Sequence, residues 1–181
     1  QWGLDYGVNN INGKIKKNEI DLIFQFCLKN KINVFDTARD YGNAEKTLGK
    51  LSKKYATNIE IISKIKNFEL NSTNFNKKKI KELILETHRN TFQNFIEGIL
   101  IHDDSLINHK YFPDLWNLLV ELKNEYKIKK IGVSTYMNNL NNNIIKKYKF
   151  DIVQIPYNVY DQTRSDNGLF RRLKDNNIEI H

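Results

Sequence analysis

Short runs of β-branched residues alternate with longer stretches of helical periodicity along the whole chain. Apolar residues recur at helical spacing over about 17–30, 43–55, 72–91, 111–126, 138–148 and 167–176. Between these stretches, strand-like runs occupy about 32–35, 59–63, 98–101, 130–133, 151–155 and 178–180. Such alternation indicates parallel strands joined by right-handed crossovers. We therefore predict an α/β fold, with Ser72 or Thr73 capping the third helix.

Two architectures, a doubly wound sheet and a barrel, fit this order of elements. A dinucleotide-binding doubly wound sheet would carry G-x-G-x-x-G after a strand, but Gly42 and Gly49 are isolated, and no G-x-x-x-x-G-K-[ST] sequence is present. Polar residues instead stand at the ends of the predicted strands, where a barrel gathers its site. We therefore predict a (β/α)8 TIM-type barrel, incomplete in this chain, with residues 1–181 forming a single domain.

Four residues at or just beyond the ends of three successive predicted strands have the chemistry of a proton-donating site. They are Asp36, Tyr41, Lys64 and His102. A tyrosine phenol has an unperturbed pKa of about 10, so it needs a neighbouring cation to act as an acid near neutral pH. Lys64 could supply that charge, and Asp36 could keep the lysine protonated. His102 could then orient a carbonyl oxygen toward Tyr41.

Each of these four residues also has an ordinary structural explanation. Asp36 could cap a turn, Tyr41 could be a loop aromatic, Lys64 could be a solvated strand end, and His102 could be a buried imidazole with its hydrogen bonds satisfied. The carboxyl ends of barrel strands converge on one face, however, and polar residues there tend to belong to one site. Their joint placement therefore favours a shared function.

Hydrolytic chemistry is a second alternative for the same region. His102, Asp103 and Asp104 could be ligands for zinc or manganese in a barrel hydrolase. The second histidine pair that such a site requires is missing, and no G-x-S-x-G sequence indicates a serine hydrolase. We predict no metal site.

The segment FDTARDYGNAEKTLGK resembles the corresponding segment of the aldo-keto reductase family, and SKI, LIHD, GVST and VQIPYNVYD follow in that family's order. The resemblance covers nearly the whole chain. It implies a barrel that binds NADPH or NADH across its C-terminal face and passes a hydride to a carbonyl carbon. Tyr41 would correspond to the proton donor, Lys64 to the residue that lowers its pKa, Asp36 to the partner of the lysine, and His102 to the carbonyl-orienting group.

The same resemblance implies which residues contact the cofactor. Ser134 and Gln154 would hold the nicotinamide carboxamide, and Asp36 and Thr135 complete the implied set. In many members of the family an asparagine follows the serine, whereas this chain has Thr135. A threonine hydroxyl can make only part of the contacts of an amide.

The length of the chain bears on how much of a barrel it contains. A whole barrel takes about 250 residues, and the opening QWG resembles the tail of a first strand. We therefore expect a fragment that lacks the start of the first strand and the C-terminal part of the barrel. The loops that would bind the phosphates and adenosine of the cofactor would lie beyond residue 181, so the sequence does not distinguish NADP from NAD.

The resemblance implies reduction of an aldehyde or ketone, and QWGLDYGV favours a sugar as the substrate because it is similar to members associated with sugar metabolism. A catalytically silent barrel that binds cofactor or a protein partner is the alternative. Residue types alone do not show turnover.

Composition excludes several other classes of protein. The net charge of +8 could attract phosphates, but no RNA-binding aromatic motif or zinc-finger spacing accompanies the lysines, so we predict no nucleic-acid partner. No run approaches the roughly 20 apolar residues that cross a bilayer, and no signal peptide is visible. The single Cys27 lies on an apolar helical face, as expected for a core residue in a reducing compartment. We predict a cytoplasmic protein with a small carbonyl compound as its partner.

Overall fold

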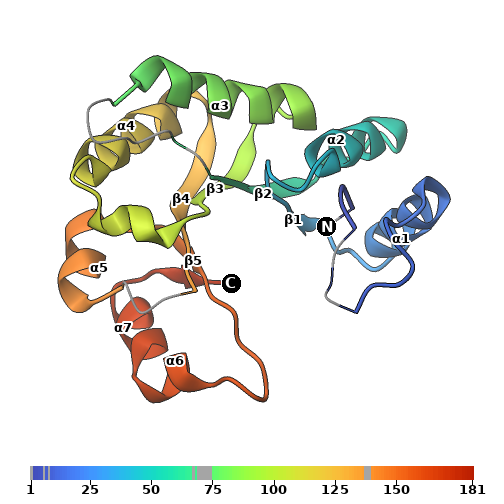
Figure 1. The fold of residues 1–181 in the computed structure, drawn as a ribbon. Coiled ribbons are helices and arrows are strands. Elements are labelled where there is room, and N and C mark those ends of the chain that lie inside the picture. Colours follow the sequence, from blue (N-terminus) through green and yellow to red (C-terminus); the bar gives the residue numbers. More distant parts are fainter. Residues whose placement is uncertain (1, 6, 8, 67, 69–74, 137–139) are drawn as a thin grey trace.

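Six parallel strands lie side by side in chain order. The computed structural model describes residues 2–5, 7, 9–66, 68, 75–136 and 140–181. The strands in this part are β1 (Val34–Asp36), β2 (Glu60–Ile65), β3 (Ile96–Ile101), β4 (Ile128–Ser134), β5 (Ile152–Gln154) and β6 (Glu179–Ile180). Each strand pairs in parallel with the next. The sheet curls into half of a barrel with β1 and β6 at its edges (Figure 1), so the predicted α/β barrel architecture is confirmed in this incomplete form.

One helix precedes β1, others connect the successive strands, and the helices pack on the outer side of the curled sheet (Figure 1). They are α1 (Lys17–Lys29), α2 (Ala44–Lys54), α3 (Lys77–Thr91), α4 (Phe112–Glu125), α5 (Asn142–Tyr148), α6 (Thr163–Asp166) and α7 (Leu169–Asp175), with a 3-10 helix, η1 (Asp104–Asn108), after β3. All six predicted helical stretches contain a helix. The short elements η1 and α6 were not predicted, because one turn of helix is too short to show a periodic pattern.

Two helices begin later than their periodicity predicts, because an asparagine caps each of them. The side chain of Asn76 accepts a hydrogen bond at 3.1 Å from a backbone N–H in the first turn of α3. Asn141 does the same for α5 at 3.0 Å. Such a bond satisfies one of the free N–H groups at a helix start, and the helix begins at the next residue. The predicted caps Ser72 and Thr73 lie outside the described residues.

The apolar residues form separate layers on the two faces of the sheet. On the outer face, one cluster packs β1 and β2 against α1 and α2, and a larger one packs the later strands against α3, α4, α5 and α7. On the inner face, Ile62, Leu100 and Ile152 meet in a small cluster of their own. Successive side chains of a strand point to opposite faces. Residues two positions beyond this inner cluster therefore also face the interior of the barrel.

A buried carboxylate ties α2 to β2 and α3. Glu45 is 3% exposed and accepts hydrogen bonds from Ser63 Oγ at 2.7 Å, Thr87 Oγ1 at 3.1 Å and Asn90 Nδ2 at 2.9 Å. All three donors are neutral, so among the described residues the Glu45 side chain is held by hydrogen bonds and not by a salt bridge. Ser63 lies next to Lys64 in β2. The network therefore holds the outer side of the strand whose inner side carries that lysine.

Replacing Glu45 with alanine should destabilise the protein strongly. The change leaves the Ser63 hydroxyl and the Asn90 amide without their acceptor and leaves Thr87 only a long bond to the oxygen of Leu83 at 3.5 Å, and each unsatisfied group costs about 1–3 kcal/mol. We expect the free energy of unfolding, measured by urea denaturation, to fall by about 3–5 kcal/mol. The matched change Glu121→Ala, on the exposed side of α4, should alter it by less than about 0.5 kcal/mol. Similar losses in the two variants would show that the network is not stabilising.

The six turns that lead from a helix into each strand share one backbone feature. Each contains a residue with positive φ that is not glycine: Lys31, Ala56, Phe92, Lys127, Lys149 and Asn177. The left-handed conformation costs a residue with a side chain about 1–2 kcal/mol. Each turn therefore stores a small, local strain that glycine would relieve.

Ala56→Gly tests this strain, because Ala56 has φ 46° and is exposed. Relief of the left-handed penalty exceeds the greater entropy that glycine brings to the unfolded chain, so we expect a gain of about 0.5–1 kcal/mol in unfolding free energy. Glu121→Gly, in the interior of α4, should instead lower it by about 1 kcal/mol. A loss of stability in Ala56→Gly would contradict the explanation.

Candidate active site

Five polar side chains form a row along the inner, carboxyl edge of the sheet. Asp36, Ser134 and Gln154 end β1, β4 and β5, Lys64 is the penultimate residue of β2, and His102 directly follows β3. Lys64, His102 and Gln154 each stand two positions beyond a member of the inner cluster Ile62, Leu100 and Ile152, listed in strand order. The strand register places Ser134 opposite Gln154. Alternation along the strands therefore turns the row into the barrel interior.

Lys64 is the most buried member of this row, with its side chain 2% exposed. Its Nζ donates a hydrogen bond to Asp36 Oδ2 at 2.6 Å and another to the backbone oxygen of Thr37 at 2.9 Å. Burial lowers the pKa of the Lys64 ammonium, while the charge of Asp36 and its hydrogen bond work against that shift. The carboxylate is thus the group that keeps a proton on Lys64.

Asp36 also links the two halves of the site. Its Oδ1 accepts a hydrogen bond from Gln154 Nε2 at 3.0 Å, although β1 and β5 are not neighbours in the sheet. The residues are 118 positions apart in the sequence. Only the curvature of the sheet brings them together, so this bond spans the concave inner face.

Tyr41 and His102 complete the cluster around Lys64. Their ring centroids are 5.8 Å apart, with the rings near perpendicular at 77°. Lys64 Nζ lies 5.3 Å from the centroid of the Tyr41 ring. Asp36, Tyr41, Lys64 and His102, predicted to share a site, are therefore brought together as one group, whereas their chemical roles stay predictions.

Two features of the loop after β1 hold Tyr41 in place. Backbone hydrogen bonds join Arg39 N to the oxygen of Lys64 at 3.0 Å and Tyr41 N to the oxygen of Ala38 at 3.1 Å. The segment around Gly3 packs so closely on this loop that a Cβ at Gly3 would lie 1.5 Å from the backbone carbonyl oxygen of Tyr41. Only glycine allows this approach. The N-terminal segment thus supports the loop from behind.

His102 lies in an environment that favours the neutral imidazole. Burial lowers its pKa most, and the positive charge of Lys64 lowers it further, while Asp40, with Oδ2 3.8 Å from His102 Nδ1, opposes the shift. Among the described residues, the buried Nδ1 has no hydrogen-bond partner. A buried ring nitrogen in that state is suited to a ligand or a water molecule.

Ser134 and Thr135 point to different sides of the sheet. Ser134 belongs to the inner row, and both residues are buried. The hydroxyl of Thr135 donates a hydrogen bond to the carboxylate of Asp104 in η1, and its backbone N–H bonds to the oxygen of Gln154 at 2.9 Å. The Thr135 side chain is thus held toward η1. The sequence did not predict this orientation.

Several contacts of the site lay outside the sequence-based prediction. Thr37 and Asp40 belong to the same FDTARDY segment as the predicted residues, so their nearness along the chain was a usable signal. Asp104 was considered only as a metal ligand, and its bond to Thr135 has no local signal. In the described part of the chain, no group of three or more His, Cys, Asp or Glu side chains could hold a metal ion.

The sequence model of a protein family described as "Aldo/keto reductase family" matches residues 4–181 of this chain. The fold is similar to that of an aldo-keto reductase from Bacillus halodurans in its holo form, with a TM-score of 0.76, 20% identity, and coverage of 91% of this chain and 56% of that chain. It is also similar to an aldo/keto reductase from Klebsiella pneumoniae in complex with NADP and acetate, with a TM-score of 0.72, 14% identity, and coverage of 91% and 56%. No curated protein matches the sequence.

The chain spans 56% of the length of each of these two proteins, and at such low identities the likeness concerns the fold. None of the helices in the described ranges is long and apolar enough to cross a membrane. The cytoplasmic location stays a prediction.

The lowered pKa of His102 predicts how stability depends on pH. Between the pKa of His102 in the folded protein and its unfolded value near 6.5, the unfolded state binds more protons than the folded state. Stability should therefore fall as the pH drops below about 6.5. Urea denaturation between pH 8 and 5 should show a smaller fall in His102→Gln. If unfolding free energy depends on pH in the same way in the unmodified protein and in His102→Gln, His102 does not have the lowered pKa.

Proposed function

Because the chain belongs to the aldo/keto reductase family, we propose that the protein is an NAD(P)H-dependent oxidoreductase that reduces the carbonyl group of an aldehyde or ketone. The observation that carries this proposal is the cluster of Asp36, Lys64, Tyr41 and His102 on the inner edge of the sheet. A phenol, an ammonium and an imidazole gathered around one point can bind a carbonyl oxygen and protonate it as negative charge develops there.

Tyr41 is the proposed proton donor. Lys64 lies close to its ring, and a positive charge beside a phenol favours loss of the phenolic proton. Asp36 acts one step further back, since its carboxylate keeps Lys64 protonated against the effect of burial. In this proposal, Asp36 on β1 keeps Lys64 charged, and Lys64 in turn helps Tyr41 to donate its proton to the carbonyl oxygen.

His102 is the proposed hydrogen-bond donor to the same oxygen. A neutral imidazole carries one N–H, which can bind the carbonyl oxygen and stabilise the charge that develops on it. The lowered pKa keeps the ring neutral near pH 7, so it does not compete with Tyr41 as the acid. Its edge-on contact with the Tyr41 ring keeps the two side chains adjacent.

The inner row also fits a nicotinamide cofactor. When bound, the cofactor supplies the hydride. Ser134 and Gln154 stand opposite each other on β4 and β5, and a hydroxyl and an amide together offer the donors and acceptors that match a carboxamide. Asp36 steadies the Gln154 amide. We also assign Thr135 to this subsite, where it contributes through the turn after β4, which its bond to Asp104 holds.

We favour NADPH as the cofactor on the strength of one fold relative, whose structure contains NADP. The proposed substrate is a small carbonyl compound, with sugars as the first class to assay. The alternative is a silent barrel that binds the cofactor, or a protein partner, without turnover.

Tyr41→Phe tests the reductase directly. Loss of the proton donor should lower kcat for reduction by the full-length protein by about two to four powers of ten. Oxidation of NADPH would be followed with aldehydes, ketones and sugars, and cofactor affinity, measured by protein fluorescence, should stay unchanged. Tyr160→Phe, at a position 97% exposed, is the matched control and should keep full activity.

The outcomes separate the two candidate functions. Equal activity in Tyr41→Phe and the unmodified enzyme would refute Tyr41 as the acid. Cofactor binding without turnover of any carbonyl class would favour the silent barrel. Absence of cofactor binding would contradict the reductase and would leave only the form of the silent barrel that binds a protein partner.

A further inference from the structure

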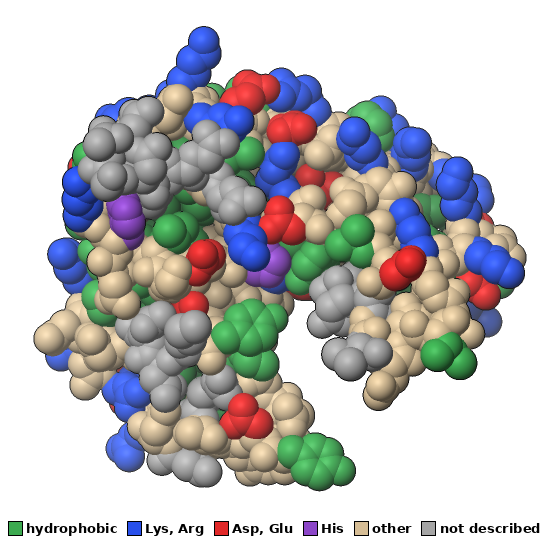
Figure 2. Space-filling view, in the orientation of Figure 1, with side chains coloured by type: hydrophobic (Ala, Val, Ile, Leu, Met, Phe, Trp, Pro, Cys, Tyr) green, Lys and Arg blue, Asp and Glu red, His purple; other side chains and the backbone are tan. Residues whose placement is uncertain are grey.

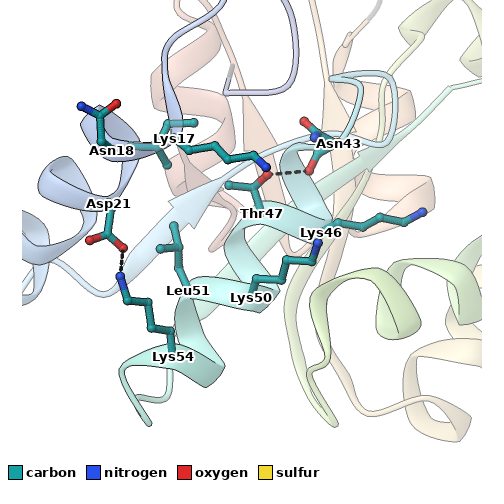
Figure 3. A pocket seen from close by; sticks show the side chains of 10 residues that line it. Lys17, Asn18, Asp21, Asn43, Lys46, Thr47, Lys50, Leu51 and Lys54 are labelled. Carbon is teal, nitrogen blue, oxygen red and sulfur yellow. Dashed lines mark hydrogen bonds and ion pairs between the residues drawn. The ribbon is translucent and has the colours of Figure 1, made fainter.

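A cleft of about 540 Å³ lies between α1 and α2, on the outer side of the barrel (Figure 3). Its floor is apolar and its rim is polar. Leu51 and Ile20, which form part of the floor, are almost fully buried. The rim is formed by Lys17, Asn18, Asp21, Asn43, Lys46, Thr47, Lys50 and Lys54. Clefts that hold small molecules have volumes of about 300–1,000 Å³, so this one has the size of a ligand site.

The wall formed by α2 carries a column of like charges. Lys46, Lys50 and Lys54 are spaced four residues apart, which places them on one face of the helix. The only acidic residue of α2 is Glu45, whose carboxylate is buried and bonded to Ser63, Thr87 and Asn90. Lysines at this spacing repel each other by about 0.2–0.5 kcal/mol per pair. The helix therefore has no acid of its own to balance the column.

Within the described ranges, only the Lys54 end of this column has an acidic partner. Lys54 Nζ lies 2.6 Å from Asp21 Oδ1, and the other oxygen of Asp21 accepts a hydrogen bond from Tyr55 at 2.7 Å. The ammonium groups of Lys46 and Lys50, and that of Lys17 in α1, have no hydrogen bond or ion pair with another described residue. Positive charge is thus concentrated at the Thr47 end of the cleft.

Lysines from both helices reach this end. In Figure 3, Lys17 extends from α1 across to Thr47 of α2, and the ammonium of Lys50 points toward the same end from the next turn of α2. Lys46 extends in the opposite direction, away from α1. Figure 2 shows Lys and Arg side chains gathered over this side of the molecule, around α2. Two helices therefore present ammonium groups to one concave site.

We propose that this cleft binds a small organic phosphate with at least two phosphoryl groups. Two ammonium groups without acidic partners among the described residues match the charge and the many oxygens of a diphosphate better than the single charge of a carboxylate. The amide of Asn18 can donate to a further oxygen, and the apolar floor at Ile20 and Leu51 can pack the organic part. The volume fits a molecule of nucleotide size rather than a polymer. The proposal does not depend on the chemistry of the inner row.

Calorimetric titration of the full-length protein tests this site. Pyrophosphate and ADP would be compared with sulfate at equal ionic strength near 0.15 M, where surface attraction beyond about 8 Å is screened. We expect pyrophosphate to bind, ADP to bind more tightly, and sulfate to bind at least tenfold more weakly. Equal binding of all three anions, or no binding, would overturn the proposal. If ADP binds no more tightly than pyrophosphate, the proposal that the apolar floor packs the organic part of the ligand would be wrong.

Two matched double variants assign the binding to the cleft. Lys17→Gln with Lys50→Gln removes the converging charges and should weaken pyrophosphate binding about tenfold or more. Lys29→Gln with Lys78→Gln removes the same charge from exposed positions on α1 and α3 and should leave it unchanged. Equal weakening in both would show a general charge effect and overturn the site. Tyr41→Phe should bind pyrophosphate normally, so a failure of the reductase proposal would not affect this result.

Discussion

The arrangement of the inner edge depends on one ion pair, in which the ammonium is buried and the carboxylate is partly exposed. Lys64 carries its charge in an almost solvent-free position, and the carboxylate of Asp36 lies 2.6 Å from it. A buried ammonium without a partner would lose its proton or destabilise the fold. The pair therefore couples two requirements, since the charge that would assist Tyr41 exists only while β1 and β2 are correctly joined. Structural integrity and the protonation state of the site depend on the same contact.

Asp36 extends this dependence across the sheet. Its second oxygen holds Gln154, so one carboxylate joins the proposed acid–base group to the proposed cofactor subsite. On the opposite face, Glu45 anchors β2 through Ser63, next to Lys64. The strand that carries the lysine is thus held from both sides by carboxylates, one fully buried and one partly exposed. Such paired anchoring suits a site whose geometry must be held by rigid elements.

Much of the fold follows from local patterns in the sequence, because period-2 and period-3.6 hydrophobicity directly report which elements face a core. Parallel pairing then places strand ends together, which is why Asp36, Lys64 and His102 could be grouped in advance. The bond between Asp36 and Gln154 depends on sheet curvature, and that of Thr135 depends on where η1 lies. Neither is a property of any local stretch of residues. The late starts of α3 and α5 reflect capping by single side chains, which periodicity does not detect.

The strict alternation of the two faces makes strand length more critical than strand composition. Inserting one residue near the middle of β2 would exchange the faces of every later residue in that strand. Lys64 would then turn among the helices, and Ser63 would enter the barrel in its place. Substitutions in the strand alter one contact at a time, whereas a single insertion would displace the ion pair and the Glu45 anchor together. In this protein, β2 should therefore tolerate substitutions more readily than insertions or deletions.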